Sequence, residues 1–441
     1  MNVFCAIKPS LNLSFLILTS VMSNRPRGAA KRDKSRKEFP TTLQGFGYFF
    51  NENGQLRSIK GNIPFRFDVK EGDQNYNQAH YEALGKVIEQ HIYHLLSHQE
   101  DLERVVIPLD AIEGEPTSCI FRSRNIDQYE KLLILVHGSG VVRAGQWTRK
   151  LIINHSLESG SQIPYIRKAQ LENYGVVVLN TNQNEDIETG EGIVRGNGTP
   201  ENHFLYVWDK IIEPSGVRHI AIMAHSYGGL VVLEAVNKRP GEFKERVFAI
   251  AMSDSIHGVG RLGNTSKDHL VKEFFKESAR NWVSSKLPLD SHVESNNPID
   301  SNRVSAGTLK HIKTSWYAFA SVFDFFQRNF DHKISQLSRR GIRSTPSSPI
   351  AAENETPVTD VPRKDSKERR KLSEEVSSGP EANEPETTEA VSLSTEVITD
   401  EGKDILTTVT GRRLSNKQPV EHELLDDETE EGRKKTDKDE F

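Results

Sequence analysis

Residues 217–233 constrain the fold of this chain more than any other stretch. The apolar run VRHIAIM breaks at AHSYGG and resumes as LVVL, an order that predicts a strand, a tight turn and a helix. Small residues two before and two after a serine, here Ala224 and Gly228, let strand and helix approach closely while a strained turn exposes the hydroxyl. The pattern predicts a nucleophile elbow at Ser226. The structural alternative is an ordinary serine in a glycine-rich turn.

Composition limits how much of the chain can form a core. Of 441 residues, 35% are hydrophobic and 27% charged, and from about residue 335 onward aromatic side chains are absent until Phe441. Such a segment cannot bury enough apolar surface to offset the entropy of ordering. We therefore expect one α/β domain over residues 43–333 and a disordered charged tail over 334–441. The net charge of -5 favours neither nucleic acid nor a membrane as a partner of the whole protein.

The two ends of the chain carry competing targeting signals. Residues 1–23 have an apolar stretch and small residues near Ser23, which indicates a signal peptide or hydrophobic leader that is too short to span a bilayer. Residues 24–42 form a basic segment that we expect to be flexible, and its Lys/Arg run indicates nuclear localisation. The last four residues, Lys438 to Phe441, resemble an endoplasmic reticulum retrieval signal. We expect a nuclear and cytoplasmic protein, with the endoplasmic reticulum lumen as the alternative.

Strand-like and helix-like segments alternate along the central domain. Asn77–His98 and Asn202–Ile212 have helical periodicity, and a hairpin is expected over Leu43–Ile59 around Asn53-Gly54. Besides the strand before Ser226, strands are expected at Val105–Leu109, Cys119–Arg122, Leu132–Val136, Val176–Leu179, Arg246–Met252 and Arg303–Ala306. This alternation predicts an α/β-hydrolase-like fold, a mostly parallel sheet with helices on both faces. Residues 261–300 have no clear assignment, and Thr314–Phe330 is expected to be a helix with an aromatic core stripe.

A second glycine-rich loop follows the expected strand Leu132–Val136. It reads His137-Gly138-Ser139-Gly140 and resembles the loops that supply an oxyanion hole next to a nucleophile elbow. We expect the backbone N–H groups of Tyr227, Ser139 and Gly140 to be the oxyanion donors. His137 itself is expected to be a structural residue that bonds to the backbone.

An elbow serine needs a base and a carboxylate that orients the base. In hydrolases of this fold these residues follow the serine in the order acid, then histidine. His311 lies in the loop between the last expected strand and the last helix, which is the position of the base. Asp254 directly follows a strand at the edge where ligands gather, and Asp290 is the alternative acid. The predicted triad is Ser226, His311 and Asp254.

We expect no metal and no cofactor. The chain has two cysteines, Cys5 and Cys119, which excludes a cysteine-based metal site. The histidines of the helix Asn77–His98 have no carboxylate or cysteine spaced to complete a site with them, so we expect them on or beside its wet face.

Several motifs together resemble the argonaute-binding (Arb-type) domain family. They are Leu132–Gly140, Ala224–Gly229, Met252–His257, and Ser305-Ala306-Gly307-Thr308 with His311 and Thr314-Ser315-Trp316. The resemblance covers about residues 43–333 and implies a member of the branch of animal cotranscriptional regulators with an α/β-hydrolase-like fold. It also implies argonaute, chromatin and splicing factors as partners, and a nucleophile that maps onto Ser226. The final Phe441 departs from the usual Leu of the family's retrieval-like C-terminus.

Two functions follow from these observations. The first is an adaptor that binds argonaute and chromatin proteins through a hydrolase-like domain, in cotranscriptional or splicing complexes. The alternative is an active, esterase-like serine hydrolase that uses the predicted triad. Fold alone does not separate them, because function depends on the site.

Overall fold

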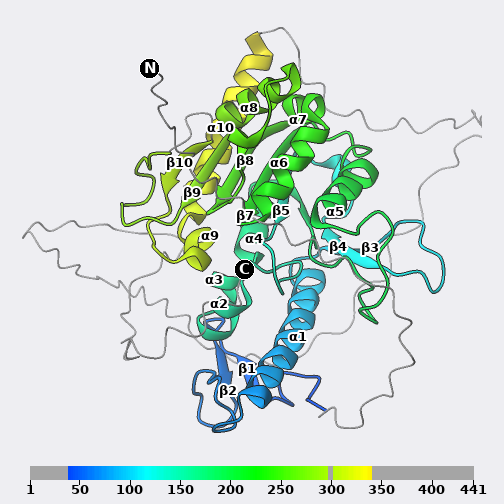
Figure 1. Ribbon diagram of the computed structural model, residues 1–441, viewed down its shortest axis with the longest axis vertical. Coiled ribbons are helices and arrows are strands. Elements are labelled where there is room, and N and C mark those ends of the chain that lie inside the picture. Colours follow the sequence, from blue (N-terminus) through cyan, green and yellow to red (C-terminus); the bar gives the residue numbers. More distant parts are fainter. Residues whose placement is uncertain (1–37, 296–300, 340–441) are drawn as a thin grey trace, which may run out of the picture.

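The computed structural model describes residues 38–295 and 301–339 (Figure 1). Its centre is an eight-stranded sheet in the order β10-β9-β8-β7-β5-β6-β4-β3. β4 runs antiparallel to β3 and β6, and the other neighbouring strands are parallel. The strands of this sheet are β3 (Glu103–Ile107), β4 (Ser118–Arg122), β5 (Lys131–Val136), β6 (Tyr174–Val178), β7 (His219–His225), β8 (Val247–Ser253), β9 (Ala279–Val283) and β10 (Asn302–Ser305).

Helices cover both faces of this sheet. Helices α1, α2, α4 and α10 contribute to one apolar cluster, and helices α5 to α8 contribute to the other. The helices are α1 (Gln74–His98), α2 (Arg149–Asn154), α3 (Leu157–Gly160), α4 (Ile163–Leu171), α5 (Pro200–Val207), α6 (Gly228–Lys238), α7 (Pro240–Arg246), α8 (Ser266–Ser278), α9 (Thr314–Tyr317) and α10 (Phe319–Arg339). Shorter turns of helix are η1 (Ile126–Gln128), η2 (Trp208–Ile212), η3 (Val259–Arg261) and η4 (His311–Lys313).

The side chains of β5 show how one apolar strand serves both layers. Leu133 and Leu135 belong to the cluster under α1 and α10, whereas Leu132 and Ile134 belong to the cluster under α5 and α6. Alternate residues of a strand point to opposite faces, so a strand covered on both sides must be apolar throughout. The α/β-hydrolase-like fold that the sequence predicts is therefore confirmed.

The N-terminal hairpin was also predicted. β1 (Tyr48–Phe50) pairs with β2 (Leu56–Ser58) in antiparallel register, and Gly54 takes a positive φ of 68° in the turn. Ordered packing begins before residue 43, because the ring of Phe39 stacks on Phe46. Residues 1–37 and 340–441, which include the predicted leader, most of the basic segment and the tail, lie outside the described residues.

One histidine of α1 differs from its predicted placement. His80 is buried and lies edge-on against the ring of Phe46, 5.0 Å between centroids, whereas His94 and His98 are exposed as expected. His80 is four residues before Leu84, on the stripe of α1 that faces the core. No group of three or more His, Cys, Asp or Glu side chains within residues 38–295 and 301–339 is placed to hold a metal ion.

The region that sequence patterns left unassigned contains α8 and β9. A capping box begins α8, because Thr265 accepts from the N–H of Asp268 while the Asp268 carboxylate accepts from the N–H of Thr265. β9 then pairs with β8 and β10.

The C-terminal helix also differs from the expectation. The expected helix Thr314–Phe330 is interrupted at Ala318, and α10 continues to Arg339, beyond the expected boundary at 333. Of the expected core stripe, Phe323 and Phe326 are buried and Phe319 and Phe330 are partly buried, while Trp316 lies outside the core and lines a small cavity. No helix in the described part of the chain is both long and apolar enough to cross a membrane.

Candidate active site

Ser226 occupies a strained turn between β7 and α6. Its φ is 52°, in the left-handed region, and its N–H donates to the carbonyl of Ser253 at 2.9 Å. The helix comes very close to the neighbouring strand end, because a Cβ on Gly228 would lie 2.7 Å from the carbonyl oxygens of Val136 and His137. Only glycine fits there. The local geometry is that of a nucleophile elbow, with Ser226 half-buried at the carboxyl edge of the sheet.

Asp254 and His311 are brought together from positions 57 residues apart. His311 Nδ1 lies 2.8 Å from Asp254 Oδ2. Asp254 directly follows β8 and has a positive φ of 45°. An Asp bonded to Nδ1 leaves Nε2 of the same ring for a hydroxyl, which is the tautomer a general base needs.

Ser284 holds the other side of the Asp254 carboxylate. Its N–H donates to Oδ1 at 3.1 Å and its hydroxyl donates to Oδ2. Burial alone would raise the pKa of Asp254, but the hydrogen bonds from His311 and Ser284 outweigh burial and lower it. The carboxylate is therefore ionised at neutral pH and can stabilise an imidazolium at His311.

The alternative acid, Asp290, lies in a different set of contacts. Its Oδ1 accepts from the indole N–H of Trp282 at 2.8 Å, and both its oxygens accept from the Ser321 hydroxyl, at 2.6 and 2.7 Å. These bonds join β9 to α10. Asp290 makes no hydrogen bond to His311 within the described residues, so its observed role is structural.

The loop after β5 lies directly over the elbow. A Cβ on Gly138 would be 3.1 Å from the Cβ of Ser226. Asn182, in the loop that follows β6, holds this loop, because its side-chain amide donates to the carbonyls of Gly138, Gly140 and Val142 at 2.9 to 3.2 Å. Within the described residues, the N–H groups of Ser139, Gly140 and Tyr227 have no hydrogen-bond acceptor. These three N–H groups are the predicted oxyanion donors.

His137 lies beneath this loop and is buried. Its Nδ1 is 2.9 Å from the Gly138 carbonyl. Burial lowers the pKa of His137 to about 4, so the ring is neutral at physiological pH. The predicted backbone-bonding role is confirmed.

The structure brings most of the predicted site residues to one edge of the sheet, with one contact missing. No hydrogen bond joins the Ser226 hydroxyl to His311 in the described part of the chain. His225 directly precedes Ser226, and its ring centroid is 4.8 Å from that of His311.

Sequence reasoning did not find Asn182 and Ser284. Asn182 follows β6 at the same edge as Ser226, so its position after a buried strand was a usable signal. Ser284 had no such signal, because β9 itself was not recognised.

Comparisons with known proteins assign a family to this chain. The Arb2 domain profile matches residues 39–188 and 184–289. The chicken protein named "Cotranscriptional regulator ARB2A homolog" is 42% identical over 359 residues, which cover 70% of this chain and 85% of that protein. The human protein named "Cotranscriptional regulator ARB2A" is 41% identical over 359 residues, with the same coverage of 70% and 85%.

Solved structures give a much weaker likeness. The histone deacetylase Clr3 is 14% identical with a TM-score of 0.38, over 56% of this chain and 39% of that chain, and a likeness of this size supports no assignment. The family assignment does not use this likeness. The profile match and the identity to the two relatives show that the chain belongs to the Arb2 domain family.

Proposed function

We propose that this chain is a cotranscriptional regulator whose Arb2 domain works through protein partners. The observation that carries the proposal is the 42% identity to a chicken protein of that name over 85% of its length. The partners that the family resemblance implies are argonaute proteins and chromatin or splicing factors. A hydrolase-like fold suits such a role, because its scaffold can keep its shape while its surface is used for binding.

Affinity purification tests this role. Tagged protein, expressed in cells and purified after nuclease treatment, should enrich argonaute and splicing factors over the tag alone. The Ser226→Ala variant is the matched control, since an adaptor role predicts the same partners for both proteins. Absence of argonaute enrichment from the wild-type sample contradicts the partner assignment.

The proposed location is the nucleus and cytoplasm. The basic run Arg25–Lys37 supports it, and the alternative is the endoplasmic reticulum lumen. Cell fractionation with N-terminal sequencing separates the two: an N-terminus near residue 24 in a lumenal fraction overturns the nuclear assignment.

A second candidate function is supported by the site geometry. We propose that the domain also acts as a serine hydrolase on an ester or similar acyl substrate. The supporting observation is the 2.8 Å contact between His311 Nδ1 and Asp254, next to a strained Ser226. This arrangement orients His311 so that its Nε2 can take the proton of the serine hydroxyl.

The reaction follows from these positions. The Ser226 oxygen attacks the acyl carbon while its proton passes to His311, and the N–H groups of Tyr227, Ser139 and Gly140 stabilise the oxyanion. Collapse breaks the bond to the leaving oxygen, which takes the proton from His311. Water then attacks the acyl-serine, gives a proton to His311 and releases the carboxylic acid, and the proton returns to Ser226.

A fluorophosphonate probe tests the hydrolase function directly. Wild-type protein should be labelled, and Ser226→Ala should lose the label. Ser139→Ala is a suitable control, because it keeps the backbone N–H that the mechanism uses. A wild-type protein that is not labelled overturns the hydrolase proposal and leaves the adaptor role standing.

A further inference from the structure

A run of hydrogen bonds joins neighbours of all three predicted catalytic residues. His225 Nδ1 is 3.0 Å from the Ser253 hydroxyl, which is 2.7 Å from the Ser315 hydroxyl. His225 directly precedes Ser226 and Ser253 directly precedes Asp254. Ser315 lies four residues after His311, in the short segment formed by η4 and α9. The run therefore connects the three segments on which the site depends.

Ser315 fixes the His311 segment at two points. Its hydroxyl bonds to Ser253, and its carbonyl accepts from the hydroxyl of Tyr165 at 2.7 Å. Both Ser315 and Tyr165 are buried, so neither bond is exchanged readily with water. The segment is thus attached to the sheet by Ser253 and to α4 by Tyr165.

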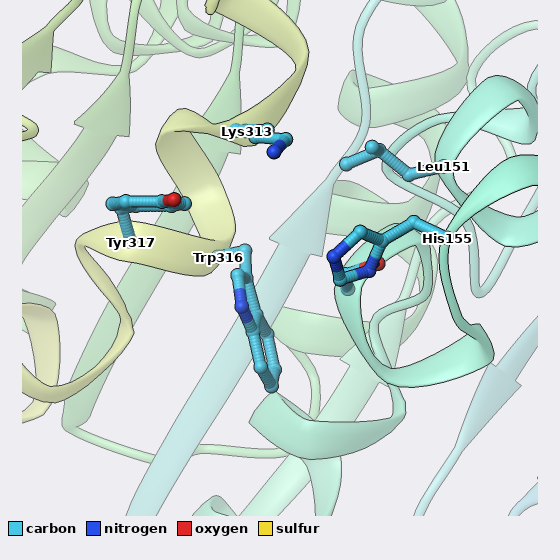
Figure 2. Close-up of a pocket in the computed structure, with 6 residues that line it drawn as sticks. Leu151, His155, Lys313, Trp316 and Tyr317 are labelled. Carbon is cyan, nitrogen blue, oxygen red and sulfur yellow. The ribbon is translucent and has the colours of Figure 1, made fainter. Parts of the chain in front are cut away.

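Packing on another side of this segment is incomplete. A small cavity of about 10 Å³ separates the segment from the α2–α3 region (Figure 2). Its lining residues are Lys313, Trp316 and Tyr317 on one side and Leu151, His155 and Ser159 on the other. A cavity of this size has room for about one water molecule.

The ring of His225 lies beside the ring of His311. The centroids are 4.8 Å apart and the planes are inclined by 35°. His225 Nδ1 is also 3.1 Å from the Ser253 carbonyl, which can only accept, so this nitrogen carries the hydrogen. Burial lowers the pKa of His225 to about 3, and the ring stays neutral when His311 takes a proton. The carboxylate of Asp254 contacts His311, and Lys310 and Lys313 lie one and two residues from it in the sequence.

We propose that His225, Ser253 and Ser315 form a positioning network that holds the His311 imidazole between Asp254 and Ser226. The network contacts no substrate. It acts on catalysis by fixing where the His311 segment sits and by presenting an uncharged ring to the base. This inference rests on the proposed hydrolase function and names the residues that regulate the same site.

The test removes the link at Ser315 and measures the rate of fluorophosphonate labelling. Loss of the link in Ser315→Ala should loosen the His311–Asp254 pair, so labelling should slow about tenfold. Ser315→Thr keeps a hydroxyl and should recover the wild-type rate, and Ser253→Ala should slow labelling as Ser315→Ala does, because it removes the partner on the sheet. Ser118→Ala is the matched control, because Ser118 is equally buried and its hydroxyl has no partner within the described residues.

The NMR signal of the His311 ring N–H, which reports the bond to Asp254, separates this inference from the hydrolase proposal. Loss or a marked shift of this signal in Ser315→Ala supports the network whether or not the wild type is labelled. The inference is overturned if Ser315→Ala leaves the signal unchanged. It is also overturned if Ser118→Ala alters the signal as much as Ser315→Ala does.

Discussion

The turn that carries Ser226 and the segment that carries His311 are held in opposite ways. Ser226 follows a fully buried strand, and its geometry is set by backbone contacts at Gly228. His311 lies at the surface with 47% of its side chain exposed, and its position depends on side-chain bonds that reach it from Asp254 and, through Ser315, from Ser253. The nucleophile is therefore fixed by close backbone packing, whereas its base is fixed by side-chain bonds.

The largest effect should come from breaking the long-range contact of the base. Asp254→Asn replaces the carboxylate at His311 Nδ1 with an amide, which favours the wrong imidazole tautomer and cannot stabilise an imidazolium. We expect fluorophosphonate labelling to slow by about a thousandfold with the fold intact. Labelling rates and circular dichroism of the purified variant measure the two effects separately.

Asp290→Asn is the matched variant for this prediction. Asp290 bonds to Trp282 and Ser321 rather than to His311, so the change should lower stability by about 1 kcal/mol and leave labelling within a factor of about three. If Asp290→Asn abolished labelling and Asp254→Asn did not, the assignment of the acid would be reversed.

The elbow should instead be destabilised when the close backbone packing at Gly228 is disturbed. In Gly228→Ala the new methyl group would lie 2.7 Å from two carbonyl oxygens, which cannot move aside without distorting β5. We expect a loss of about 3 kcal/mol in the free energy of unfolding, measured by urea denaturation. Gly241→Ala is the control, because nothing lies within 4 Å of its new Cβ and alanine favours the helix α7. Equal stability of the two variants would show that the elbow is not closely packed.

Acid should lower the stability of the protein through the buried histidines next to the Ser226 turn. Burial lowers the pKa of His225 to about 3 and of His137 to about 4. An unfolded histidine titrates near pH 6.5, so below that pH the unfolded chain binds protons that the folded protein excludes. The free energy of unfolding should fall from pH 6.5 toward pH 4, by up to about 1.4 kcal/mol per pH unit for each ring.

Urea unfolding at pH 7, 6 and 5 measures that slope. His137→Gln should make the slope shallower, because it removes one histidine that binds a proton only in the unfolded chain. The exposed His98 is the control, and His98→Gln should leave the slope as it is. A stability that is flat between pH 7 and pH 5 would contradict the neutral state of the buried rings.

The same contrast explains what sequence patterns could predict. The elbow, the loop after β5 and the positions of most strands follow from local composition, since buried strands and glycine turns have strong signals. The residues that hold His311 in place do not follow from local composition. Asp254 could be proposed from its place after a strand, but Ser284 depends on β9, whose sequence Ala-Arg-Asn-Trp-Val mixes charge with apolar residues and gives no strand pattern. Ser315 lies in an expected helix that is broken at Ala318, and only the three-dimensional contact with Ser253 reveals its role.

The smallest expected effect tests whether the acid needs its second partner. Ser284→Ala removes the hydroxyl bond to Asp254 but keeps the backbone N–H bond at 3.1 Å. The pKa of Asp254 should rise, because a bond that favours the carboxylate is lost, and water can replace that bond since the side chain of Asp254 is 21% exposed. We therefore expect labelling at pH 7 to slow only about threefold, with a larger loss toward acid pH. Ser285→Ala is the adjacent control, since Ser285 accepts from the N–H of Leu287 and makes no bond to Asp254 in the described part of the chain. If labelling slowed as much as in Asp254→Asn, the Ser284 hydroxyl rather than the backbone N–H would orient the acid. The position of His311 would then depend on two side chains, Asp254 and Ser284, instead of on Asp254 alone.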